Sequence, residues 1–68
     1  MKEYTNSQID RLINEHIHSY RNRQILKSRY IDGLTHEALS EKYELSVKQI
    51  RNIIYKSEMI LDKHLKDN

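Results

Sequence analysis

The sequence predicts an all-α fold of four helices, and three features of the chain lead to this fold class. The 68 residues include no proline and a single glycine, so few residues are present that would interrupt helices or build tight turns. Apolar residues recur three or four positions apart, which is the spacing of one helix face. Polar residues of the kind that begin helices precede these apolar runs, namely Thr5, Ser19, Thr35 and Ser46.

The first helix is expected to begin at Thr5 or Asn6 and to run to about His18. One side of this helix would be an apolar stripe made of Ile9, Leu12, Ile13 and Ile17. The stripe has two interpretations. It packs on the protein's own core, or it forms the contact surface of a homodimer.

The second helix is expected to follow Ser19 and to end near Asp32. Its apolar residues would be Ile25, Leu26 and Tyr30. Gly33 then ends it, because a residue just past a helix end commonly adopts the left-handed conformation, which glycine enters without steric cost. The sequence therefore predicts a structural role for Gly33.

Two further helix starts divide the rest of the chain. Thr35 would cap a third helix that ends near Tyr43, and Ser46 would cap a fourth helix. The fourth helix would continue to about Leu65, and Gln49 follows its cap by three residues, as in a capping box. The two helices would meet through apolar residues that share helix faces, which are Leu39, Tyr43, Leu45, Ile50 and Ile53.

A short helix, a tight connection and a second helix form the layout of a helix-turn-helix DNA-binding motif. The second helix, from Ser46 to about Tyr55, would be the recognition helix that enters the major groove. Glutamine and asparagine can pair with adenine there, while lysine and arginine can contact guanine or phosphate. For Tyr55, packing against a neighbouring helix is an equal alternative. The residues expected to face outward are Lys48, Gln49, Arg51, Asn52, Tyr55 and Lys56.

Three residues outside the recognition helix are expected to approach the flanking DNA backbone. Thr35 and His36 begin the third helix, whose positive N-terminal end attracts phosphate. Arg29 precedes it and supplies a guanidinium group.

The formal net charge of +2 is small, but the charges are unevenly distributed along the chain. Residues 20–29 and residues 48–56 contain basic residues and no acidic ones. The charged residues between them, at positions 30–47, are mainly acidic. Each basic segment taken alone is also typical of an ordinary solvated helix face. Their coincidence with the helix-turn-helix layout favours DNA binding.

Length and composition exclude several other classes of protein. Residues 1–68 are expected to form one domain, and the absence of cysteine favours the cytoplasm, as does the lack of a leader or a membrane-spanning apolar run. The four histidines lack the spacing that places two imidazoles on one helix face, so neither a metal nor a cofactor is expected. No nucleophile motif or phosphate-binding glycine loop is present, and the sequence therefore predicts no enzyme.

The segment from Ile25 to Leu61 resembles region 4 of the primary sigma-factor family, which recognises a promoter element. The resemblance is carried by the string ILKSRYIDGLTHEALSEKYELSVKQIRNI, in which a hydrophobic pair, an Arg-aromatic pair and a glycine turn precede a Thr-capped helix and a Ser-capped recognition helix. The match is tightest over residues 50–53. The resemblance implies a sigma region 4-like part over residues 20–65, with residues 1–19 as an added N-terminal helix.

By position, the resemblance implies that base contacts come from Val47, Lys48, Gln49, Arg51 and Asn52. It also implies a role for Arg29 at the DNA backbone or in the structure. The chain departs from the family pattern at Ser28 and Ser40, where apolar residues are usual. It departs again at Val47, where a polar residue that contacts bases is common.

The chain is therefore expected to be a sequence-specific DNA-binding transcriptional regulator, similar to the small stand-alone sigma-like proteins that phages and prophages often encode. One such module buries about 600–1,000 Å² on double-stranded DNA. A second contact is thus expected, in a homodimer or with RNA polymerase, and no membrane contact is expected. The alternative is a protein-interaction module that acts as an adaptor or inhibitor on RNA polymerase or another regulator.

Overall fold

Residues 4–65 fold into four α-helices in the computed structural model, and this part of the chain contains no strand. The predicted all-α class is confirmed. The helices are α1 (Asn6–His16), α2 (Tyr20–Tyr30), α3 (His36–Tyr43) and α4 (Val47–Leu65). The first helix ends two residues earlier than expected, because Ile17 already has an extended backbone.

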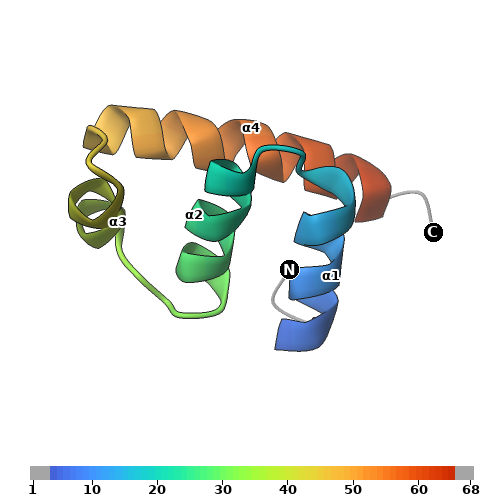
Figure 1. The fold of residues 1–68 in the computed structure, drawn as a ribbon. Helices are drawn as coiled ribbons and strands as arrows, with labels where there is room; N and C mark the ends of the chain where they lie inside the picture. Colours follow the sequence, from blue (N-terminus) through green and yellow to red (C-terminus); the bar gives the residue numbers. More distant parts are fainter. Residues whose placement is uncertain (1–3, 66–68) are drawn as a thin grey trace.

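Helices α2 and α4 organise the molecule, since each of them packs against the other three helices. Figure 1 shows α4 running along one side, with α1 and α2 next to each other against it and α3 at its N-terminal end. The chain reverses direction between α1 and α2, so the end of α1 and the start of α2 both lie close to α4 (Figure 1).

The predicted helix starts are confirmed by hydrogen bonds of the capping residues. The side chains of Thr5, Ser19 and Thr35 each accept from a backbone N–H three residues later. Thr5 also forms a complete capping box with Gln8, whose side chain accepts from the Thr5 backbone N–H at 2.9 Å. A cap satisfies donors that a helix start would otherwise leave unpaired, which fixes where each helix begins.

Gly33 has the left-handed backbone that the sequence predicted, with φ of +75°. It lies in the connection between α2 and α3, because α2 ends at Tyr30 and not near Asp32. A Cβ atom on Gly33 would meet no atom within 4 Å, so the requirement for glycine comes from the backbone conformation alone. The connection is held further by Arg29, whose guanidinium donates to the carbonyl oxygen of Leu34 at 2.9 Å.

One core is shared by all four helices. Its buried apolar residues are Ile9, Ile13, Ile17, Ile25, Leu26, Leu39, Ile50, Ile54 and Leu61. The isoleucines of the N-terminal stripe belong to this core, and Leu12 packs against it. Of the two interpretations of the stripe, the structure supports packing on the protein's own core, and these isoleucines offer no exposed surface to a second copy.

The two serines that stand at usually apolar positions are compensated by hydrogen bonds. Ser28 is buried, and its hydroxyl lies 3.0 Å from the hydroxyl of Tyr43, which links α2 to α3. The Ser40 hydroxyl donates to the carbonyl oxygen of Leu45 in the connection that follows α3. These positions thus exchange apolar contact for specific polar contact, which stabilises only if both partners are present.

A polar contact also ties α2 to α4. The hydroxyl of Tyr30 donates to the carboxylate of Glu58. Burial, and next the hydrogen bond and the negative charge of Glu58, raise the pKa of Tyr30 well above its usual range. No helix within residues 4–65 is both long and apolar enough to cross a membrane.

Replacing Gly33 by valine is expected to destabilise the protein by about 1–2 kcal/mol, because a β-branched residue is strained at this positive φ. Gly33→Asn should destabilise the protein clearly less than Gly33→Val, since asparagine enters the left-handed region more readily. Urea denaturation followed by circular dichroism measures both. Equal stability of the valine variant and the wild type would contradict the assigned role.

The hydrogen bond between Ser28 and Tyr43 can be tested by a double-mutant cycle. Ser28→Ala and Tyr43→Phe should each cost about 1–2 kcal/mol, because each leaves one hydroxyl without its partner. The double variant should lose less than the sum of the two. Additive losses would show that the two hydroxyl groups do not interact.

Candidate nucleic-acid interface

The start of α4 is fixed by a capping box at the predicted residues. The backbone N–H of Gln49 donates to the Ser46 hydroxyl at 3.1 Å, and the Ser46 N–H donates to Oε1 of Gln49 at 2.9 Å. The connection before it turns at Glu44, which has a left-handed backbone with φ of 56°. A backbone hydrogen bond from Leu45 to Ser40, 3.1 Å long, closes that turn. The direction in which α4 leaves α3 is therefore set locally.

One side of α4 is buried and the other is exposed. Ile50, Ile54, Ser57 and Leu61 face the core. The exposed residues of its first turns are the ones expected from the sequence, which are Lys48, Gln49, Arg51, Asn52, Tyr55 and Lys56. Val47 is half-buried, so it offers less surface than its position in the family pattern implied. Tyr55 is 64% exposed, so most of its side chain is open to an external contact and is not packed on a neighbouring helix.

The cations on this exposed side lack partners within the part of the chain that the structure describes. Lys48, Arg51 and Lys56 form no ion pair and no side-chain hydrogen bond with any residue from 4 to 65. No acidic residue lies between positions 48 and 56. Their charge is therefore available to an external anion.

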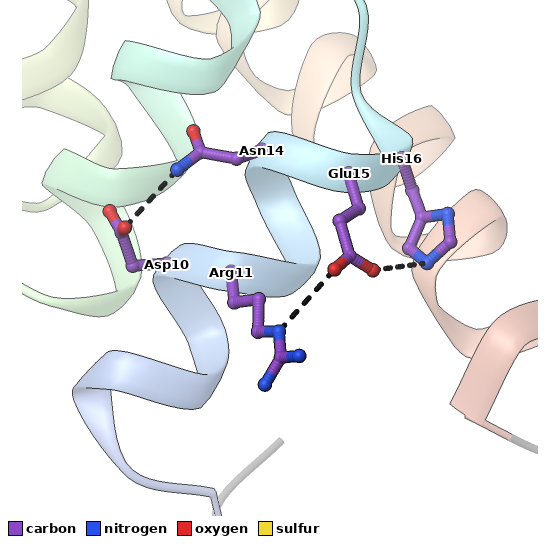
Figure 2. A network of polar contacts seen from close by, with 5 residues as sticks. All are labelled: Asp10, Arg11, Asn14, Glu15 and His16. Atoms are coloured by element: carbon purple, nitrogen blue, oxygen red, sulfur yellow. Dashed lines mark hydrogen bonds and ion pairs between the residues drawn. The ribbon is translucent and has the colours of Figure 1, made fainter.

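Helix α1 shows the opposite arrangement (Figure 2). Its outward polar groups already have partners: Arg11 lies 3.4 Å from Glu15, and the Asn14 amide donates to Asp10 at 3.2 Å. Asp10 also pairs with Lys27 of α2 at 2.9 Å. These groups largely cancel one another, so the polar side of α1 is a weak candidate for binding an anion.

Gln49 is less free than a base-contacting residue is expected to be. Bidentate pairing with adenine needs both its carbonyl oxygen and its amide nitrogen. The carbonyl oxygen already accepts from the Ser46 N–H at 2.9 Å. Asn52 has no such hydrogen bond with a described residue, and it is therefore better placed to pair with adenine.

Of the basic residues in segment 20–29, three have structural partners. Arg23 donates to the carbonyl oxygens of Ile17 and His18, at 2.9 and 3.0 Å, and so closes the end of α1. Lys27 pairs with Asp10, and Arg29 donates to Leu34. Arg29 therefore fulfils the structural part of its expected role. A run of basic residues in a sequence does not reveal which of the side chains have a partner within the protein and which are available to a ligand.

The start of α3 presents two further predicted residues. Thr35 is exposed, but its hydroxyl accepts from the Ala38 N–H at 3.1 Å and so acts as the helix cap. His36 is half-buried in the first turn of α3. Both lie at the N-terminal end of α3, which itself packs on α4.

Two shallow grooves flank Asn52, and the sequence did not predict them. One, of about 300 Å³, lies between α4 and the connection that precedes α2, and His18, Asn22 and Lys56 are among the residues that line it. The other, of about 220 Å³, brings Arg21 beside Gln49 and Asn52. Arg21, His18 and Asn22 are thus the residues near the candidate interface that sequence reasoning missed, because only the fold brings them to α4.

The structure also brings together two histidines far apart in the sequence. The rings of His16 and His64 stack with centroids 3.6 Å apart, where the end of α1 meets α4. Within residues 4–65 no group of three or more potential ligands, whether histidine, cysteine or acidic, is arranged to hold a metal ion. Comparison with models of protein families, with curated proteins and with solved structures finds no match for the chain.

The double role of Gln49 leads to a prediction about stability. Ser46→Ala should destabilise the protein by about 1 kcal/mol, because it removes the cap of α4. Gln49→Glu should keep the stability close to wild type, since a carboxylate can also accept from the Ser46 N–H. Thermal unfolding measures both variants. A large loss for Gln49→Glu would contradict the capping role.

Proposed function

We propose that the protein is a DNA-binding transcriptional regulator whose recognition helix is the N-terminal half of α4. The observation that carries this proposal is the exposed side of α4, where Lys48, Arg51, Asn52 and Lys56 lie together without acidic residues. Helices α3 and α4, with the short connection between them, would then act as a helix-turn-helix motif.

In this mechanism the first turns of α4 enter the major groove. Asn52 pairs with adenine, while Lys48 and Arg51 contact guanine or phosphate. Lys56, one turn further on, neutralises a backbone phosphate. Thr35 and His36, at the start of α3, contact the flanking backbone, where the positive end of the helix favours an anion.

The family proposed for the chain is that of sigma region 4-like regulators. The support is the motif string and its agreement with the observed helix starts at Ser19, Thr35 and Ser46. A positive-φ glycine, Gly33, lies in the connection before α3, in agreement with the glycine turn of the pattern. A single module of this size needs a second contact for tight specific binding, and we propose a second copy or RNA polymerase for that role.

One observation favours a second candidate function. In addition to its basic residues, α4 carries three exposed apolar or aromatic side chains. These are Tyr55, Met59 and Ile60, which are 64%, 57% and 43% exposed. Exposed apolar side chains on one helix are typical of a protein-interaction surface. The rival proposal is therefore an adaptor or inhibitor that binds RNA polymerase or another regulator through α4.

Salt dependence distinguishes the two proposals. The purified protein should bind random-sequence duplex DNA at low salt, and the affinity should fall steeply as salt rises, because each neutralised phosphate releases condensed counterions. Fluorescence anisotropy of a labelled duplex over several salt concentrations measures this. Absence of binding by the folded protein at low salt would favour the protein-interaction proposal and direct the search to a polymerase pull-down.

Two matched variants locate the DNA on the protein. The pair Lys48→Gln and Arg51→Gln should lower the salt slope by about 2, as two phosphate or base contacts are lost. The control pair Arg11→Gln and Lys42→Gln removes the same charge from exposed positions on α1 and α3. Equal effects of the two pairs would contradict the assignment of α4 as the recognition helix.

A further inference from the structure

The first turn of α2 lies beside the exposed side of α4, and this proximity extends the candidate interface beyond one helix. Arg21 lines one groove with Gln49 and Asn52. The preceding connection lines the other groove with Lys56. Asn52 lies between the two grooves and lines both of them. Any molecule that covers Asn52 therefore also approaches the start of α2.

Arg21 differs from the other basic residues of α2 in being available. Arg23, Lys27 and Arg29 each have a partner at 2.9 Å in the protein. Arg21 is exposed, and among residues 4–65 its guanidinium donates only to the neighbouring Asn22 side chain, at a long distance of 3.5 Å. A contact of that length between exposed groups is easily exchanged for a stronger one.

The surroundings of Arg21 favour an anion. No acidic residue lines either groove. Lys56 places a positive charge in the first groove, and Arg21 places one in the second. A surface with cations on two elements and no carboxylate between them attracts a polyanion, which carries charges at regular intervals.

We propose that Arg21 is a second DNA contact, made to a backbone phosphate next to the bases that α4 recognises. This inference rests on the proposed DNA-binding function. A phosphate is the expected partner because the guanidinium fork matches two phosphate oxygens. The contact thus positions α4 without contributing to sequence preference.

The geometry explains why a contact from α2 would matter. Helix α2 packs against the other three helices, so the backbone that carries Arg21 is fixed relative to α4. With contacts from both α2 and α4, the DNA backbone is held on two sides of Asn52. A contact on one side alone would leave α4 free to tilt in the groove.

The test compares two variants of equal charge. Arg21→Gln should weaken binding to every duplex by the same factor and lower the salt slope by about 0.9. Arg11→Gln removes an exposed arginine from α1 and should leave the affinity and the salt slope unchanged. His18→Lys adds a charge beside Lys56 in the first groove and should raise the slope by a similar amount.

The outcomes separate this inference from the function on which it rests. If the Lys48 and Arg51 variants lose DNA binding while Arg21→Gln behaves like Arg11→Gln, α2 makes no contact with DNA. The assignment of α4 as the recognition helix is then retained. If the wild-type protein binds no DNA, both proposals fail together. If Arg21→Gln changes the preferred sequence, Arg21 contacts bases, and the phosphate assignment is wrong. Circular dichroism confirms that each variant is folded.

Discussion

The burial of two consecutive residues of α2 is the constraint on which the rest of the structure depends. Ile25 and Leu26 are both fully buried, although neighbouring residues of a helix point about 100° apart. One flat contact cannot cover both side chains, so α2 needs helices on more than one side. Helix α1 supplies one contact, and α3 and α4 supply the others. Packing against α2 buries one side of α4, and the opposite side of α4 is left exposed.

Local features of the fold could be predicted from the sequence, because the interactions that determine them join residues only a few positions apart. Helix caps at Ser19 and Ser46 are of this kind, and so is the turn at Gly33. Long-range pairs escaped prediction. The bond between Ser28 and Tyr43 and the stack of His16 on His64 depend on how helices pack, which no local spacing reveals.

The candidate site shows the same division. Exposure between Lys48 and Lys56 follows from the helical period, and the sequence predicted these exposed residues, whereas Val47 before them is half-buried. Whether a cation is free depends on partners elsewhere in the chain. Lys27 pairs with Asp10 on α1, seventeen positions earlier, while Arg21 in the same basic run contacts, among residues 4–65, only the neighbouring Asn22. Charge counting therefore overestimated the contribution of segment 20–29.

The isoleucines of α1 and of its C-cap make the surface of α4 dependent on a helix that lies outside residues 20–65. Ile9, Ile13 and Ile17 share one core with Ile50 and Ile54 of α4, so part of the core that supports α4 is supplied from outside residues 20–65. Undocking of α1 would expose the inner side of α4 to water and lower the population of the ordered helix. Ligand affinity at α4 would fall by the same factor. A ligand that captures α1 would thus act as a distant antagonist of any ligand bound to α4.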